Sequence, residues 1–252
     1  MVIRAAVLWL ALALPAGAEG IVSGLSQNRV SITADFDGSE ILIYGAVKRD
    51  APAPEGSPLQ VIVTVEGPST PVTIRRKARR AGIWINTDVV TVEAAPSFYA
   101  IASTAPLAAI LSDTDDLRHR VTLGRIISAV GATTEAADAP SFLSALMRLR
   151  GAEQRYRLDE NGVRLTEGTL FRADVLLPAN LTEGDYRVRI FLTRDRAVID
   201  AQESVINVRK EGLERLIYTL AHDQPLVYGA VSLLLAVAAG WGASAAFRLV
   251  RP

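Results

Sequence analysis

The feature that most constrains this chain is a run of 22 residues, Leu226–Phe247, without a single charged side chain. Pro225 precedes the run, and Arg248 and Arg251 follow it. As an α-helix with a rise of about 1.5 Å per residue, the run extends about 33 Å, enough to cross a hydrocarbon core of about 30 Å. We therefore predict a transmembrane helix over residues 225–247.

A second apolar segment, at the start of the chain, predicts a secretory signal peptide over residues 1–18. Arg4 supplies the positive start, Ala5–Leu14 is an apolar run, and Ala16-Gly17-Ala18 offers the small residues that signal peptidase accepts. The apolar run is too short to span a bilayer comfortably. We expect cleavage before Glu19, and an uncleaved anchor is the alternative.

The two apolar segments predict the same orientation in the membrane. The tail after the predicted span, residues 248–252, carries two arginines and no acidic residue, and such tails stay in the cytoplasm. This orientation agrees with an exported N-terminus. We expect a single-span protein with almost all of its mass outside the cytoplasmic membrane.

Composition excludes several function classes. Lys+Arg and Asp+Glu both number 27, so the chain lacks the basic excess of a dedicated nucleic-acid binder. It has no cysteine and only two histidines, His119 and His222, which removes thiol chemistry and most histidine-based sites. No phosphate-binding loop, dinucleotide fingerprint or zinc-protease motif is present. We expect no catalytic residues, no cofactor and no metal site; an unrecognised hydrolase with convergent carboxylates is a remote alternative.

Between the two membrane segments, period-two hydrophobicity predicts a β region over residues 19–104. Val30, Ile32 and Phe36 alternate with polar residues, as in a half-buried strand. Many short strands separated by turns favour a β-sandwich. The further strands expected are Ile41–Val47, Leu59–Val65, Val72–Arg75, Ile83–Asn86, Val89–Glu93 and Phe98–Ser103.

The periodicity becomes helical over residues 105–155, where Phe142 and Leu146 lie on one expected helix face. Strand patterns resume over residues 156–211. There a Leu-x-x-Gly-x-Tyr entry, ending at Tyr186, is typical of the tyrosine corner of immunoglobulin-like sandwiches.

The predicted fold class is therefore mainly β: an immunoglobulin-like β-sandwich ectodomain with a helical insertion or connector and one C-terminal transmembrane helix. An amphipathic segment over residues 212–224 should lie at the membrane surface before the span. The same periodicity would arise from one sandwich interrupted by helices or from two β modules, 19–104 and 156–211. We favour two modules, because strand patterns are extensive on both sides of the helices.

Several segments resemble an alphaproteobacterial transmembrane protein family of unknown function. The resemblance covers nearly the whole chain after the signal peptide. It implies a protein of the bacterial cytoplasmic (inner) membrane with a periplasmic domain and a cytoplasmic C-terminus, and it suggests a neighbouring sulfite-exporter-like permease as partner. The segments that carry it are Phe36–Lys48, Gly82–Asn86, Pro96–Ala100, Gly212–Arg215, His222 and Tyr228-Gly229.

The densest charge cluster holds five positive charges in six residues, and it is a candidate contact for anions or a partner protein. Lipid phosphates, an anionic glycan or an acidic protein surface would be attracted to it. A solvated loop between two strands is the alternative. The candidate residues are Arg75, Arg76, Lys77, Arg79 and Arg80.

Within the predicted span, Ala236, Gly240 and Ser244 recur every four residues on one face. Small residues at this spacing let a second helix approach closely, which makes the three residues a candidate helix–helix contact. Transmembrane helices are rich in small residues in general, so an uncontacted face is the alternative.

Together these features predict a non-catalytic, single-span protein whose periplasmic β domain binds or supports a membrane partner. The expected partners are the lipid bilayer and a polytopic membrane protein such as a permease, with no nucleic acid. The alternative is a stand-alone periplasmic ligand-binding or envelope-structural domain that uses Arg75–Arg80 as its contact surface. The sequence does not define the oligomeric state.

Overall fold

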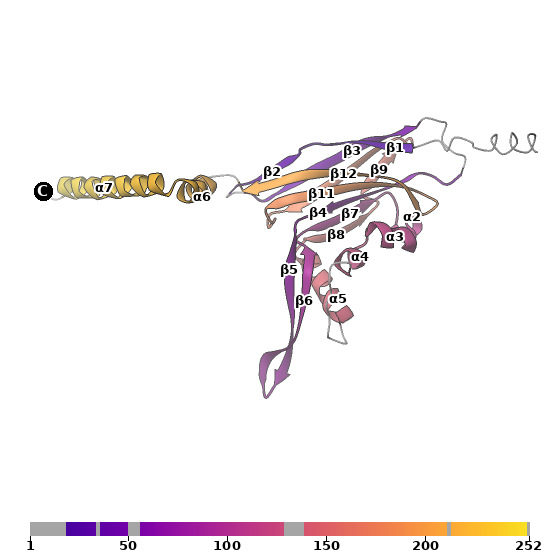
Figure 1. Ribbon diagram of the computed structural model, residues 1–252, viewed down its shortest axis with the longest axis horizontal. Helices are drawn as coiled ribbons and strands as arrows, with labels where there is room; N and C mark the ends of the chain where they lie inside the picture. The colour runs from indigo at the N-terminus through magenta and orange to yellow at the C-terminus, as the bar shows by residue number, and fades with distance from the viewer. Residues whose placement is uncertain (1–18, 34–35, 50–55, 129–138, 211–212, 251–252) are drawn as a thin grey trace, which may run out of the picture. The chain divides into compact units, whose positions relative to one another are not determined.

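The computed structural model describes residues 19–33, 36–49, 56–128, 139–210 and 213–250 (Figure 1). They divide into two units. The larger unit, which we call the β domain, holds the described residues of 1–30 and 37–208, and the smaller holds those of 31–36 and 209–252. The predicted signal peptide lies outside the described residues.

Strands dominate the β domain, which confirms the predicted mainly β class. One sheet has the strand order β1-β3-β10-β9, and a larger one has the order β2-β12-β11-β4-β7-β8, with β8 parallel to β7. The bounds are β1 Glu19–Leu25, β2 Arg29–Ile32, β3 Gly38–Arg49, β4 Gln60–Glu66, β7 Tyr99–Ser103, β8 Tyr156–Glu160, β9 Val163–Thr166, β10 Leu170–Pro178, β11 Gly184–Arg194 and β12 Ala197–Lys210.

The pairing of these strands shows that the favoured division into two β modules, 19–104 and 156–211, is wrong. β3, from before the helices, pairs along its length with β10, from after them. In the other sheet β4 pairs with β11 in the same way. Both sheets therefore contain strands from both sides of the helices, and the residues form one β domain interrupted by a helical insertion.

The alternation of buried and exposed residues along a strand shows which face of its sheet packs against the core. In β10 every second residue from Phe171 to Leu177 is buried, whereas Arg172 and Leu176 are exposed. β4 is different, because all residues from Val61 to Val65 are buried. A strand buried on both faces needs a layer on each side of its sheet.

Helices in the predicted insertion, 105–155, supply one of these layers. α2 (Leu107–Ile110), α3 (Asp113–His119), α4 (Leu123–Ser128) and α5 (Ala139–Ala152) belong to the described part of this range. Their buried residues, among them Ile127 and Phe142, form one cluster with Ile62 of β4, Tyr99 of β7 and Phe191 of β11.

The turn before β11 has the contact expected of a tyrosine corner. The buried Tyr186 hydroxyl donates a hydrogen bond to the carbonyl oxygen of Thr182 at 2.9 Å. Its ring lies 6.1 Å from that of Phe98, centroid to centroid. This contact agrees with the sequence motif, while the immunoglobulin-like assignment of the whole domain stays a prediction.

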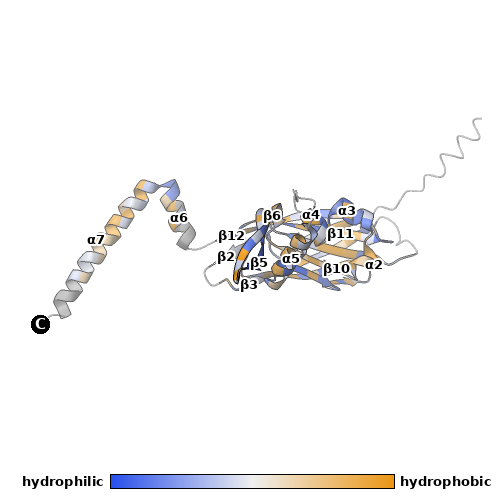
Figure 2. Cartoon of the chain, turned by 90° about the horizontal axis from the view of Figure 1, so that it is seen from below, coloured by the Kyte–Doolittle hydropathy of each residue, from blue (hydrophilic) through white to orange (hydrophobic). Residues whose placement is uncertain are grey.

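The smaller unit contains two helices, α6 (Leu213–Asp223) and α7 (Pro225–Val250). α6 occupies the segment predicted as amphipathic, 212–224. Within α7, Pro225–Ser244 is long and apolar enough to cross a membrane, and none of its hydrophobic window is buried in the chain. Figure 2 shows the hydropathy of α7, whose middle turns carry no strongly hydrophilic residue. The span predicted over 225–247 is thus confirmed as a candidate transmembrane helix.

Candidate functional site

The most prominent surface feature of the β domain is a two-stranded ribbon that projects from it (Figure 1). Its strands are β5, Ser69–Arg80, and β6, Ile83–Pro96. Ala81 and Gly82 join them with φ values of +49° and +84°, and two positive φ values are typical of a tight two-residue hairpin turn. We call this ribbon the arm, and its outer part, residues 75–89, the tip.

The arm corrects two expectations. The sequence predicted three short strands in this region, and a solvated loop between two strands was the alternative to a contact surface for the basic run. The structure instead has one long hairpin, and Arg75–Arg80 form the outer half of β5. Hydrophobic periodicity missed this part of the strand because its alternating positions are almost all cationic.

The base of the arm is fixed by the core. Ile74 of β5 and Val90 of β6 are opposite each other and are both buried, as is Val92. All three belong to the cluster that the helices form, in which Phe142 of α5 also lies. The base of the arm is therefore packed into the core of the domain.

The register of the tip gathers charge and aromatic surface on one face. Arg75 is opposite Val89, Lys77 is opposite Asn86, and Arg79 is opposite Trp84. Opposed residues point to the same side of a ribbon, and alternate residues of a strand share a face. Three cations therefore lie on the same face as the tryptophan.

Large apolar side chains at the tip remain exposed. Ile83 is 64%, Trp84 is 68% and Val89 is 56% accessible to solvent. Single exposed apolar residues are ordinary, but a group of them on one projecting element makes the tip a candidate interaction surface. Sequence reasoning missed this group. The available signal was the tripeptide Ile83–Ile85 directly after a turn that itself follows a basic run.

The five cations that the sequence singled out are not equivalent. Arg76 donates a hydrogen bond to Ser141 and its guanidinium lies 4.5 Å from the centre of the Phe142 ring, so it ties the arm to α5. Arg79 donates from Nε to the Gly82 carbonyl at 3.3 Å. Within the described residues, no ion pair joins Arg75, Lys77, Arg79 or Arg80 to a carboxylate.

The three residues of the candidate helix–helix contact lie in α7. Ala236, Gly240 and Ser244 follow one another at four-residue intervals along one face, and all three are exposed in the chain. A Cβ atom added at Gly240 would meet nothing within 4 Å. Whether another helix packs against this face stays a prediction.

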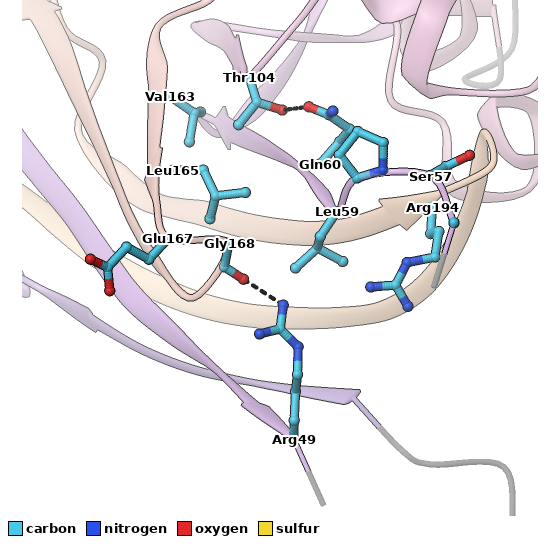
Figure 3. A pocket seen from close by; sticks show the side chains of 12 residues that line it. Arg49, Ser57, Leu59, Gln60, Thr104, Val163, Leu165, Glu167, Gly168 and Arg194 are labelled. Carbon is cyan, nitrogen blue, oxygen red and sulfur yellow. Dashed lines mark hydrogen bonds between the residues drawn. The ribbon is translucent and has the colours of Figure 1, made fainter. Parts of the chain in front are cut away.

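A pocket of about 490 Å³ is the second candidate site (Figure 3). Arg49, Gln60, Thr104, Gly168 and Arg194 are among the residues that line it. Figure 3 shows Arg49 donating a hydrogen bond to the Gly168 carbonyl, and the Thr104 hydroxyl donating one to the side-chain oxygen of Gln60.

Both arginines of the pocket are already paired. The Glu19 carboxylate lies 2.7 Å from Arg49 Nε and 2.7 Å from Arg194 Nη1, and its side chain is only 7% exposed. Burial raises the pKa of Glu19, but hydrogen bonds and charge from Arg194 and Arg49 lower it by more. The pKa of Glu19 therefore lies below its ordinary value. Glu19 pairs with both arginines, and the carboxylate of Glu167 also lines the pocket. Two negative charges therefore offset the two positive ones, and the pocket is not a strong anion site.

The sequence profile of the family described as "Putative transmembrane protein (Alph_Pro_TM)" matches residues 20–249. The chain belongs to this family. The resemblance expected from the sequence is thereby confirmed, and membership covers the β domain, the arm and the span of this Alph_Pro_TM protein.

Other comparisons add little. No curated protein matches this Alph_Pro_TM chain. Among solved structures it is similar to Spo0M, a sporulation control protein from Bacillus subtilis, with 10% identity and a TM-score of 0.29. The match covers 82% of this chain and 56% of that protein. A similarity this low does not establish a shared fold.

Among the residues that the structure describes, no group of three or more His, Asp and Glu side chains is placed to hold a metal ion. The carboxylates of Asp115 and Asp116 instead accept hydrogen bonds from backbone N–H groups of the chain. Asp115 accepts a hydrogen bond from the Val198 backbone, and Asp116 accepts one from the backbone of Val121.

Replacing Glu19 by glutamine should destabilise the β domain by about 2 kcal/mol at neutral pH, because two charged partners lose their anion. The folded-state pKa of Glu19 is lowered, so its contribution is fully present above the unfolded-state pKa of about 4.5 and is lost as pH falls through the lower folded value. Urea unfolding of wild type and Glu19→Gln across this range should therefore converge at acidic pH.

Glu167→Gln is the matched control, because Glu167 lines the same pocket but is exposed. It should leave stability unchanged at every pH. A constant difference between wild type and Glu19→Gln from neutral to acidic pH would contradict the role assigned to the Glu19 charge.

Proposed function

We propose that this protein is a non-catalytic, single-span module of the bacterial cytoplasmic membrane whose periplasmic β domain binds or supports a membrane partner. The structure of the arm is the observation that supports binding. The arm is rooted in the core by Ile74 and Val90, yet it exposes Trp84 and four cations that have no carboxylate partner among the described residues. A projecting convex element of this kind suits recognition, whereas catalysis needs a concave site that excludes water.

The orientation in the membrane is supported by charge. Arg248 and Arg251 follow the candidate span, Pro225–Ser244, and the tail has no acidic residue. Positive charge favours the cytoplasmic side, so the β domain lies in the periplasm. This agrees with a secretory signal at the other end of the chain.

The partner within the bilayer is a polytopic membrane protein, such as a permease, that packs against the face of α7 bearing Ala236, Gly240 and Ser244. Small residues allow two helix backbones to approach closely, and van der Waals packing then holds them. The family membership is consistent with this function because the family is one of transmembrane proteins.

Replacing Gly240 by leucine should sharply reduce the amount of the polytopic partner that co-purifies with the tagged protein from native membranes in mild detergent. The change adds a large side chain to the proposed contact but meets nothing within the chain itself. Mass spectrometry of the eluates measures the ratio of partner to bait.

Gly242→Leu is the control, since Gly242 is also unobstructed and lies about 200° around the helix from Gly240. It should preserve the ratio. A partner that is retained equally by both variants, or absent even with the wild-type protein, would count against the helix contact.

A further inference from the structure

We propose that the tip of the arm docks on a bilayer surface that contains anionic phospholipids. The inference rests on the proposed function only in taking the arm as a binding element, and it names the ligand of that element. It concerns a contact distinct from α7, which crosses the membrane rather than lying on it.

The charge of the tip favours this ligand. Residues 75–89 contain five cationic side chains and one acidic one, Asp88. Asp88 is opposite Arg76 in the register, the cation that α5 already engages. Arg75, Lys77 and Arg79 share the other face of the ribbon with Trp84, so positive charge is concentrated where the aromatic ring is. Such clusters attract anionic headgroups.

The order of side chains along the arm also fits a bilayer surface. Ile83 and Trp84 lie next to the turn at the very end, and the cations lie beside or behind them along β5. Tryptophan concentrates at membrane interfaces, and the long stems of lysine and arginine let their charges reach phosphates while apolar neighbours sit deeper. From Ile74 to Ala81 the strand rises about 23 Å, so the tip stands well clear of the core.

The backbone limits the depth of the contact. In a two-stranded ribbon the outer edge of each strand leaves N–H and C=O groups unpaired, and these cannot enter hydrocarbon. The tip should therefore rest at the level of the headgroups, with only side chains such as Trp84 reaching the upper acyl region. A protein partner would more naturally pair one of those edges by adding a strand.

The test uses the full chain in nanodiscs and follows the fluorescence of Trp84. The sequence contains three tryptophans, so Trp9→Phe and Trp241→Phe leave Trp84 as the single reporter. In nanodiscs of equal phosphatidylcholine and phosphatidylglycerol, Trp84 emission should shift to the blue and be quenched by lipids brominated near the headgroup. In phosphatidylcholine alone, both effects should be absent. High salt should weaken them, because it shortens the screening length from about 8 Å to about 3 Å.

Charge variants make the test specific. Changing Arg75, Lys77 and Arg79 to glutamine should abolish the blue shift and the quenching in the anionic nanodiscs. The matched control changes three other exposed arginines, Arg29, Arg148 and Arg164, to glutamine, and it should retain both effects. Equal loss in both variants would show that only net charge matters and would overturn the assignment of the tip.

A photo-crosslinking residue at position 83 in native membranes separates failure of this inference from failure of the proposed function. If Trp84 shows neither a blue shift nor quenching with anionic lipid but position 83 crosslinks to a protein, the proposed lipid ligand is wrong. The arm then remains a binding element. If neither lipid quenching nor any crosslink is observed, the arm binds nothing and the proposed function loses the observation that carries it.

Discussion

Replacing Gly45 by valine is expected to destabilise the β domain by about 3 kcal/mol, at the upper end of the range for overpacking. Gly45 lies in β3, the strand that β1 and β10 flank. A Cβ atom at this position would stand 2.5 Å from Phe171 Cζ and 2.6 Å from the Val22 carbonyl oxygen. The Phe171 ring is buried and the Val22 oxygen belongs to the backbone of the neighbouring strand, so neither can move away cheaply. Chemical unfolding monitored by circular dichroism measures the change.

Gly124→Ala is the control for this substitution, because a Cβ atom there meets nothing within 4 Å. It should leave the free energy of unfolding unchanged or raise it slightly, since alanine favours the helix. The double variant Gly45→Val with Phe171→Leu should recover only part of the loss, because the Val22 carbonyl remains in the way. Full stability of Gly45→Val would contradict the close approach of β1, β3 and β10.

Replacing Asp116 by alanine should cost about 3 kcal/mol, because three donors, in the buried Val121 and the half-buried Thr122, lose their acceptor together. Asp116 Oδ1 accepts from the backbone N–H groups of Val121 at 3.1 Å and Thr122 at 2.8 Å. Its Oδ2 accepts from the Thr122 hydroxyl at 2.7 Å. The carboxylate thus closes the corner between α3 and α4, and hydrogen exchange at Val121 and Thr122 should accelerate along with the loss of global stability.

Asp113→Ala is the matched control, since Asp113 is in the same helix but exposed. It should cost no more than about 1 kcal/mol through the helix dipole. If both variants lost the same stability, negative charge at the N-terminus of α3 rather than the hydrogen bonds at the corner would explain the contribution of Asp116. Ser112 supplies the N-cap of α3, and its side chain accepts a hydrogen bond from the Asp115 backbone N–H at 3.2 Å.

The sequence by itself determined the features that depend on local composition and period. The uncharged run Leu226–Phe247 needs only length and apolarity to become a candidate span, and α7 contains it. Alternating residues in β10 predict a strand whatever it pairs with, and the motif ending at Tyr186 predicts a bond to a neighbouring backbone group. Each of these signals lies within one segment of chain.

Only the tertiary structure decided which distant segments meet. Periodicity reports which face of a strand is buried, but it is identical for one sandwich and for two, so the pairing of β3 with β10 could not be predicted. The same limit hid the carboxylate of Glu19 between Arg49 and Arg194.

The arm shows the same division between sequence and structure. Its cations were visible as a basic run, but whether Arg79 faces Trp84 depends on the register that the Ala81-Gly82 turn sets. Burial of the base depends on the helices that follow the arm in the chain, including α5, which begins more than forty residues after the end of β6. The sequence alone therefore supplied the charge, and the tertiary structure placed it beside the aromatic surface, because register and packing are properties of pairs of segments.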